Sequence, residues 1–470
     1  MKRSKRIYLL LGILVVACIA TIIVRRVEEH KEKIKNSDEI ILKIPSESVK
    51  TLSWEYESNT LSFHKDEKWI YDEDEDFPVD EEKINELLAQ FKEFGVSFII
   101  EDVEDYGQYG LADPTCTIKF STDEKTYEVK LGDFSTMDSQ RYVSIGDGNV
   151  YLVKNDPLDH FDATLSDVIH HDETLQFDKV TEIKFTGTEN YNVVYEEGST
   201  NTYNDDDVYF AQQDGKKLPL DTTKVKSYLY NISSLSLLNY TTYNVSDEEL
   251  KKYGLDAPEL TVTVNYTKKN DDGEEISDTY VLNVSRDPEE KKAAEASEKE
   301  DSNSSEEKEI TAYARVGESK IVYKITSAEY KNLMAASYNS LRHKEVFAGD
   351  FADINKIDIS LEGTDYTITT EKKDDKRTYY YKEEELTITN LKSALQALEA
   401  ESFTDEQPKQ KKEISLTLYL DNENFSKIQI DLYRYDGTNC LAVVDGKPVS
   451  LIKRSNVVDL IEAVHAIVLD

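Results

Sequence analysis

The chain has 470 residues, of which 94 are acidic and 56 basic, so its formal net charge at pH 7 is −38. This acidic excess argues against a nucleic-acid partner, because nucleic-acid binders need a basic surface to neutralise phosphates. Thirty tyrosines and fifteen phenylalanines are typical of a folded rather than a disordered chain. The length predicts roughly two to four domains.

The N-terminus predicts a membrane anchor. Four basic residues fall within the first six positions, and residues 7–24 then contain no charged side chain. A helix of this length spans about 27 Å, enough to cross the hydrocarbon core of a bilayer. We therefore expect a cytoplasmic tail at 1–6, a single transmembrane helix at 7–24 and a juxtamembrane linker at 25–48. The bulk of the chain is expected on the extracytoplasmic face of the cell membrane.

An alternative for this segment is a lipoprotein signal. Cys18 follows Val15, Val16 and Ala17, which loosely fits a cleavage box whose cysteine becomes acylated. The apolar run continues past Cys18 to Val24, which favours an uncleaved anchor. Basic residues flank both ends of the run, so charge counts leave the orientation undecided. The extracytoplasmic placement therefore depends on the short tail and the long domain that follows.

One helix pattern occurs three times. Residues 77–91 and 218–232 carry apolar side chains at the same helical spacings, which predicts one buried helix face used twice. Asp80 and Asp221 each stand four residues before the first apolar position and suit the N-cap. A weaker third copy occupies residues 386–398, with Thr387 in the cap position.

A turn motif of tyrosine, glycine and leucine, with a proline three residues later, follows each of the first two helices. Its copies lie 144 residues apart: Tyr109, Gly110, Leu111 and Pro114, then Tyr253, Gly254, Leu255 and Pro258. Glycine readily takes the left-handed conformation that ends a helix, and proline prevents its continuation. We expect the two glycines to be equivalent helix stops.

Alternating strand patterns surround each helix in the order β-β-α-turn-β-β-β-β. The unit is roughly 130 residues long, too long for a solenoid repeat. The sequence therefore predicts an α+β fold, with tandem repeats of a mostly antiparallel sheet and a packed helix. The expected units are 49–178, 179–352 and 353–470, the third being diverged or only half formed. Residues 286–309 contain no aromatic or β-branched residue and are expected to form a disordered insertion.

Candidate chemistry is sparse. The histidine pair in 170–172 has no third ligand at a zinc-like spacing, and His343 stands in a basic setting that suits a structural connector. The acidic run 72–76 resembles a calcium loop but has Phe77 where glycine is required, and 204–207 suggests a solvated turn. No nucleotide, hydrolase or CxxC motif is present. We expect no catalytic residue, cofactor or metal site.

The motifs resemble those of a known family. A basic N-terminus, one apolar span, YGLxxP before a strand and KLGD at 130–133 before a polar hairpin resemble the bacterial domain-of-unknown-function 4340 family. The resemblance is strongest over residues 49–180 and weaker from 354 on, and the second unit has LNVSRD in place of KLGD. This family has no established activity. The resemblance implies an accessory role beside ABC-2-type transporters or gliding-motility-like auxiliary subunits.

The α+β unit occurs three times, but no cluster of polar side chains recurs with it, which favours a non-enzymatic role. We expect a membrane-anchored, extracytoplasmic repeat protein that serves as a scaffold or accessory subunit of an ABC-2-type transporter-like complex. One alternative is a binding module for wall glycan or peptide, for which tyrosine-rich strands such as 379–381 could form a platform. Another is a hydrolase of wall polymers, although nothing in the spacing of the 94 carboxylates selects a catalytic pair.

Overall fold

The computed structural model describes residues 33–469 apart from 214, 271, 299–308 and 375, together with the isolated positions 19 and 21. Cys18, the expected tail at 1–6 and nearly all of the expected span at 7–24 lie outside these residues. Over the part of the chain that the structure describes, no helix is both long and apolar enough to cross a membrane.

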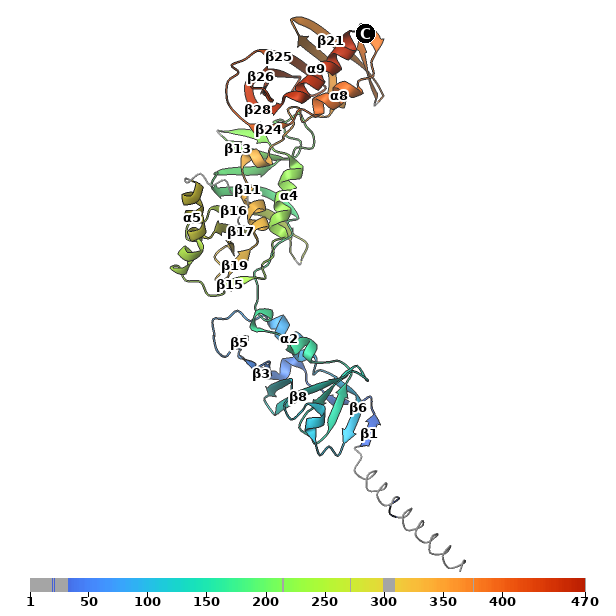
Figure 1. Cartoon of the computed structure of the whole chain (residues 1–470), viewed down its shortest axis with the longest axis vertical. Helices are drawn as coiled ribbons and strands as arrows, with labels where there is room; N and C mark the ends of the chain where they lie inside the picture. Colours follow the sequence, from blue (N-terminus) through green and yellow to red (C-terminus); the bar gives the residue numbers. More distant parts are fainter. Residues whose placement is uncertain are drawn as a thin grey trace, which may run out of the picture. The chain divides into compact units, whose positions relative to one another are not determined.

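The described residues form three antiparallel sheets of ten, nine and nine strands (Figure 1). They are distributed over two compact units, Met1–His171 with the first sheet and Asp172–Asp470 with the other two.

The first sheet has the order β1-β6-β10-β9-β8-β7-β3-β4-β5, with β2 also paired to β6. Its elements are β1 (Lys33–Asn36), β2 (Ile40–Leu42), β3 (Val49–Tyr56), β4 (Asn59–Lys65), β5 (Trp69–Tyr71), α2 (Glu81–Ala89), β6 (Phe94–Glu101), β7 (Cys116–Thr122), β8 (Thr126–Ser135), β9 (Gln140–Ser144), β10 (Val150–Val153) and α3 (Leu158–Phe161). The sheet thus begins inside the segment expected to be a linker, because β1 and β2 pair with the backbone that β6 would otherwise expose at the sheet edge.

The second sheet has the order β14-β13-β12-β11-β16-β17-β18-β19-β15. Its elements are β11 (Lys179–Gly187), β12 (Tyr191–Tyr195), β13 (Tyr209–Gln213), β14 (Lys216–Pro219), α4 (Thr222–Ser233), β15 (Tyr240–Thr242), β16 (Leu260–Lys269), β17 (Glu275–Arg286), α5 (Pro288–Glu298), β18 (Ala312–Val316), β19 (Val322–Ile325), α6 (Ser327–Met334) and α7 (Tyr338–Leu341).

The third sheet has the order β23-β22-β21-β20-β25-β26-β27-β28-β24. Its elements are β20 (Ile354–Leu361), β21 (Thr364–Lys373), β22 (Lys376–Tyr381), β23 (Glu384–Glu385), α8 (Thr389–Gln396), β24 (Ala400–Phe403), β25 (Lys412–Leu420), β26 (Lys427–Arg434), β27 (Asn439–Val444), β28 (Lys447–Lys453) and α9 (Arg454–Val468).

The three sheets share one topology. Eight strands follow in the same order in each sheet, from β5 to β6 in the first, from β13 to β15 in the second and from β22 to β24 in the third. The packed helix also occurs at the same place in the chain of each repeat. The predicted repeated α+β fold is confirmed. The third repeat is a complete copy, so the expectation that it might be half formed is wrong.

The packed helices cover one face of each sheet with the side chains that the periodicity predicted. Ile84, Leu87 and Leu88 of α2 are buried, and Val225, Tyr228 and Leu229 of α4 are their counterparts. In the third repeat, Leu391 and Leu395 of α8 join a core formed by strands β20 to β28 and by α9. Burial of these apolar faces, rather than intrinsic helix propensity, stabilises such short helices.

Two of the three expected caps are present. The side chains of Asp80 and Asp221 each accept hydrogen bonds from two backbone N–H groups in the first turn of α2 and α4. Thr387 does not cap α8, which begins one residue later, after Ile388, without a side-chain cap. The third cap was therefore assigned to the wrong residue.

Part of the expected disordered insertion is helical. Residues 288–298 form α5, because Asp287 Oδ1 accepts the N–H groups of Glu289 and Glu290 and the segment is rich in good helix formers. Lys291 of α5 lies 2.5 Å from Glu259, which attaches the helix to the loop before β16. Low hydrophobicity alone was an insufficient indicator of disorder here.

Candidate functional site

The two glycines of the turn motif adopt the same conformation. Gly110 has φ 69° and ψ 12°, and Gly254 has φ 68° and ψ 13°, both in the left-handed region. Each ends a short 3-10 helix, Tyr106–Tyr109 or Glu249–Tyr253. The leucine that follows donates its N–H back to the first turn, and its side chain is buried. Pro114 and Pro258 each precede the next strand by two residues.

These turns pack against the strand that carries the KLGD segment or its counterpart. A Cβ atom at Gly132 would lie 2.1 Å from the carbonyl oxygen of Tyr109, so only glycine fits there. A Cβ atom at Gly110 would lie 2.5 Å from Oδ1 of Asp133, and at Gly254 it would lie 2.7 Å from Oγ of Ser285. The glycines of these segments therefore stabilise the fold by allowing this close packing.

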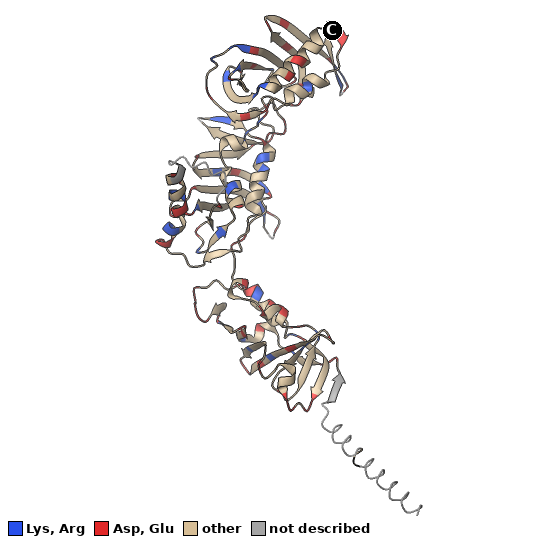
Figure 2. Ribbon diagram, viewed as in Figure 1, with Lys and Arg blue, Asp and Glu red and all other residues tan. Residues whose placement is uncertain are grey.

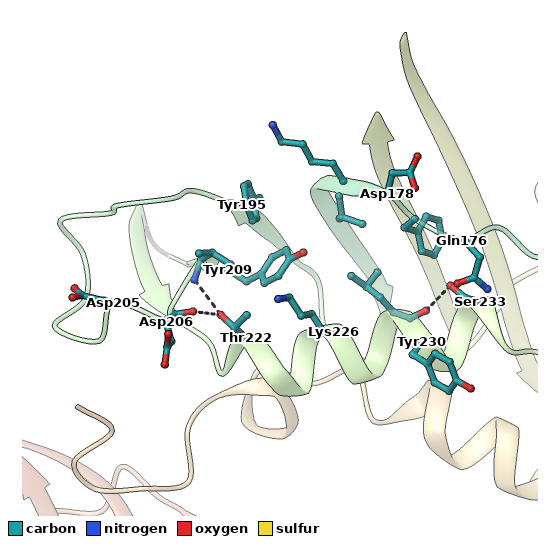
Figure 3. Close-up of a pocket in the computed structure, with 15 residues that line it drawn as sticks. Gln176, Asp178, Tyr195, Asp205, Asp206, Tyr209, Thr222, Lys226, Tyr230 and Ser233 are labelled. Carbon is teal, nitrogen blue, oxygen red and sulfur yellow. Dashed lines mark hydrogen bonds between the residues drawn. The ribbon is translucent and has the colours of Figure 1, made fainter. Parts of the chain in front are cut away.

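A cavity of about 560 Å³ lies beside α4 in the second repeat (Figure 3). Its walls are α4, the start of β11, the end of β12 and the turn before β13. Val180, Val208 and Leu229 contribute apolar surface. Polar, charged and aromatic side chains also line it, among them Phe177, Asp178, Lys179, Tyr195, Asp205, Asp206, Tyr209 and Lys226.

The turn at 204–207 is held in place on α4. Thr222, at the start of α4, donates its hydroxyl to the carbonyl oxygen of Asp206 at 2.8 Å and accepts the N–H of Val208 at 3.1 Å. Within the turn, Asn204 Oδ1 accepts the N–H of Asp206 at 3.2 Å. The turn therefore presents its carboxylates from a fixed backbone.

One residue of this turn is fully buried. The Asp207 side chain is 3 % exposed, and its Oδ1 lies 2.8 Å from Nε2 of His343. Its Oδ2 accepts the hydroxyl of Thr202 at 2.7 Å. The expectation of a solvated turn at 204–207 is wrong for Asp207, because residues distant in sequence enclose it.

Electrostatic coupling around His343 is strong. Burial by itself would lower the pKa of His343, but hydrogen bonds to Asp207 and Glu345 outweigh it and raise the pKa to about 9. The hydrogen bond from His343 lowers the pKa of Glu345 to about 2, against the opposing effect of burial. At neutral pH His343 is therefore a cation between two carboxylates.

Metal chemistry finds no support in the described part of the chain. No group of three or more His, Cys, Asp or Glu side chains there is arranged to hold a metal ion. Cys116 and Cys440 are both buried, and burial raises the pKa of each thiol to about 12, so neither is a reactive thiolate at neutral pH.

Comparison with protein families gives one match. The model described as "Domain of unknown function (DUF4340)" matches residues 69–247 and, in a second overlapping segment, residues 212–417. Together these segments cover well over half of the chain. The chain belongs to the DUF4340 family. Neither the curated proteins nor the solved structures contain a match at the significance required.

The DUF4340 matches follow the repeat period. They begin at residues 69 and 212, which lie 143 residues apart and fall at β5 and at β13, equivalent strands of the first two sheets. Each match crosses from one repeat into the next. Each match therefore spans the packed helix and the strands that follow it in one repeat and extends past the packed helix of the next.

The cavity beside α4 had no signal in the sequence. Tyr209 stands in a strand pattern like those of the other repeats, and Lys226 is one of two lysines on an amphipathic helix. The acidic run at 204–207 was visible, but nothing local separates a solvated turn from one that lines a cavity.

Proposed function

We propose that this DUF4340 chain is a non-enzymatic scaffold or accessory subunit, anchored in the cell membrane through residues 7–24, with its repeats on the extracytoplasmic face. The observation that carries the proposal is that packing elements recur in the three repeats whereas polar clusters do not. The helix faces, strand order and sheet core repeat. An enzyme built by duplication would retain a polar constellation in at least one recognisable position.

The buried and partly buried ion pairs differ between the repeats. The first repeat pairs Arg141 on β9 with Asp156, the second pairs Asp207 with His343, and the third pairs Arg377 on β22 with Asp421. Asp207 and Arg377 each stand two residues before the equivalent tyrosines Tyr209 and Tyr379, but one is acidic and the other basic. Their partners come from different elements, so no charged pair recurs. Figure 2 shows Asp and Glu distributed over the elements of all three sheets. This distribution supports a solvated scaffold with a broad surface for protein partners.

The membrane part of the proposal is tested by accessibility. Ser277 is exposed on β17, and the two described cysteines are buried. A Ser277→Cys variant in intact cells should react with a membrane-impermeant maleimide, and the parent chain should not. Labelling that appears only after lysis would place the repeats on the cytoplasmic side. Mass spectrometry that finds a diacylglyceryl group on Cys18 would replace the transmembrane anchor by a lipid anchor.

The partner is proposed to be a polytopic subunit of an ABC-2-type transporter-like complex, on the strength of the family resemblance. Crosslinking in native membranes, followed by mass spectrometry of the co-purified proteins, should recover such subunits. Recovery of the chain alone at all crosslinker lengths would contradict the scaffold role. Hydrolysis of wall polymers by the purified full chain, abolished by one carboxylate substitution, would establish the hydrolase alternative instead.

A binding module is the second candidate, and one specific observation favours it. The cavity beside α4 combines exposed charged groups that lack ion pairs to described residues with the accessible hydroxyl of Tyr209. These groups can form ion pairs and hydrogen bonds with a polar ligand.

A further inference from the structure

We propose that the cavity beside α4 binds a zwitterionic peptide or amino acid, with Lys226 contacting a ligand carboxylate and the carboxylate of Asp178 or that of Asp206, at opposite ends of the cavity, contacting a ligand ammonium. This inference goes beyond the scaffold role, and its test does not depend on the membrane anchor. It follows from a comparison of the second and third repeats at the same place in the fold.

Strand pairing establishes which residues are equivalent. Tyr195 pairs with Tyr209 between β12 and β13, and Thr370 pairs with Tyr379 between β21 and β22. Tyr209 and Tyr379 therefore occupy the same position in their sheets. When the buried helix positions Val225 and Leu391 are aligned, Lys226 of α4 is equivalent to Lys392 of α8.

In the third repeat, a phenylalanine fills the space between this tyrosine and this lysine. The Phe351 ring lies 5.5 Å from that of Tyr379, centroid to centroid, and Lys392 Nζ lies 6.0 Å from the centre of the Phe351 ring. The Tyr379 hydroxyl donates to the carbonyl oxygen of Phe351 at 3.0 Å. The Phe351 ring therefore fills the space, and the Tyr379 hydroxyl has a hydrogen-bond acceptor within the protein.

In the second repeat, the equivalent phenylalanine is turned elsewhere. Phe177 stands three residues before Val180, as Phe351 stands three before Ile354, but its ring packs edge-on against Tyr266 and Tyr280 at 5.4 and 5.9 Å. The space between Tyr209 and Lys226 is consequently part of the cavity. The first repeat has Trp69 at the tyrosine position, buried at 2 % exposure, so the opening is specific to the second repeat.

The Tyr209 hydroxyl differs from that of Tyr379. Tyr209 is 5 % exposed as a residue, but its hydroxyl, which makes no hydrogen bond to a described residue, is not among the buried polar atoms and is accessible from the cavity. Figure 3 shows the Tyr209 ring and the Lys226 side chain directed into the same space. A phenol hydroxyl that is accessible from the cavity and has no partner among the described residues can form a hydrogen bond with a polar ligand group.

The charges in the cavity select the class of ligand. Lys224, the other lysine of α4, donates to the carbonyl oxygen of Arg342 at 2.8 Å and lies 3.8 Å from Asp221. Lys226, two residues further on, faces another side of the helix and has no ion pair to a described acidic side chain. Its ammonium is available for a ligand carboxylate.

The carboxylates of Asp178, Asp205 and Asp206 are exposed and likewise make no ion pair to a described basic side chain. Asp205 and Asp206 lie at one end of the cavity and Asp178 at the other, with Lys226 between them (Figure 3). Unpaired groups of both signs complement a ligand that carries both signs. Lys179 also lines the cavity, so three acidic and two basic side chains surround it, and this acidic excess favours the ammonium as the more strongly held end.

The remaining walls accept the rest of such a ligand. The Tyr195 and Tyr209 rings, 5.4 Å apart, offer aromatic surface to an ammonium or a methylene chain, and Val180, Val208 and Leu229 offer apolar surface. A volume of about 560 Å³ lies in the ordinary range of small-ligand sites. Because Thr222 already holds the acidic turn, little conformational entropy is lost on binding.

The test uses calorimetric titration of the purified full chain in detergent with the dipeptide Lys-Ala. One modified probe is acetylated at both amino groups and loses both positive charges, and the other is amidated at the carboxyl end and loses its negative charge. Lys-Ala should bind, and each modified probe should bind about tenfold more weakly, as expected for the loss of a charge-assisted hydrogen bond. Lys226→Met should weaken Lys-Ala binding about tenfold and abolish discrimination against the amide.

Two further variants complete the test in case the Lys226→Met chain does not fold. Tyr209→Phe removes a hydroxyl that has no protein partner and should weaken binding about threefold without loss of stability. Lys251→Met, at an exposed lysine outside the cavity, is the matched control and should bind as the parent does. No binding of Lys-Ala at millimolar concentration, unchanged binding by Lys226→Met, or a preference for a neutral disaccharide would each overturn the proposal.

Discussion

Nε2 of His343, just after α7, lies 2.8 Å from Oδ1 of Asp207, although the two residues are 136 positions apart in the chain. This ion pair connects the acidic turn before β13 with the segment that leads into the third repeat. Thr222 of α4 also holds this turn, so the turn's conformation depends on both contacts.

Replacing His343 by alanine should destabilise the unit Asp172–Asp470. Asp207 would remain buried without its cationic partner, and removal of one member of a buried ion pair costs about 3 kcal/mol. Urea unfolding of the full chain, followed by hydrogen exchange, measures the loss. His160→Ala changes an exposed histidine of the other unit and is the control. Equal stability of the two variants would contradict the role of the pair.

The same ion pair predicts the dependence of stability on pH. The pKa of His343 is raised from 6.5 to about 9 in the folded chain, so its stabilisation is complete below about pH 6.5 and is lost as the pH rises through about 9. Urea midpoints measured across this interval should fall in the parent and change less in His343→Gln. A parallel fall in both chains would assign the effect to other groups.

The lowered pKa of Glu345 predicts a second loss of stability, at low pH. Its pKa is lowered from 4.5 to about 2 by His343, so its contribution is present above about pH 4.5 and is lost as the pH falls through about 2. Glu345→Gln should remove part of the acid-induced loss of stability in the second unit. An acid-unfolding curve identical to that of the parent would show that the coupling is too weak to matter.

Valine at either glycine of the turn motif should destabilise only the compact unit that contains it. A side chain at Gly110 or Gly254 is forced into the left-handed region and into contacts below 3 Å, at a cost of at least about 1–2 kcal/mol. Hydrogen exchange should then rise within Met1–His171 for Gly110→Val and within Asp172–Asp470 for Gly254→Val.

Gly437→Val is the control for both substitutions, since nothing lies within 4 Å of a Cβ atom there and its φ is not positive. Unfolding of the whole chain by either of the first two substitutions would show that the two units are not independent. Absence of any effect would show that the turns tolerate a β-branched residue.

Tyr203 should be important for cohesion between the second and third sheets. Its ring stacks on Phe347 with an interplanar angle of 4° and meets Phe425, in the turn between β25 and β26, edge-on at 5.7 Å. Tyr203→Ala removes both contacts and should cost about 3 kcal/mol. We expect the single unfolding transition of this unit to separate into two. Tyr230→Ala, at a tyrosine that is 66 % exposed, should leave one transition.

Local sequence patterns were sufficient for the repeat, its helices and its glycine turns. The spacing of Ile84, Leu87 and Leu88 identified a buried helix face, and Asp80 and Asp221 identified where two helices begin. These features depend on side chains and backbone groups a few residues apart, so a short stretch of sequence contains both partners. The left-handed glycines are local for the same reason.

Only the tertiary structure decided what lies between the repeated elements. Asp207 is buried because His343 returns to it from 136 residues away, and no pattern around either residue indicates the other. The cavity exists because the Phe177 ring packs on Tyr266 and Tyr280, whereas the equivalent Phe351 packs on Tyr379. The two phenylalanines stand at the same sequence position in their repeats, so the difference arises from the long-range packing that each ring finds. Sequence thus determined the repeated framework, and tertiary packing determined which copy of it was left open to a ligand.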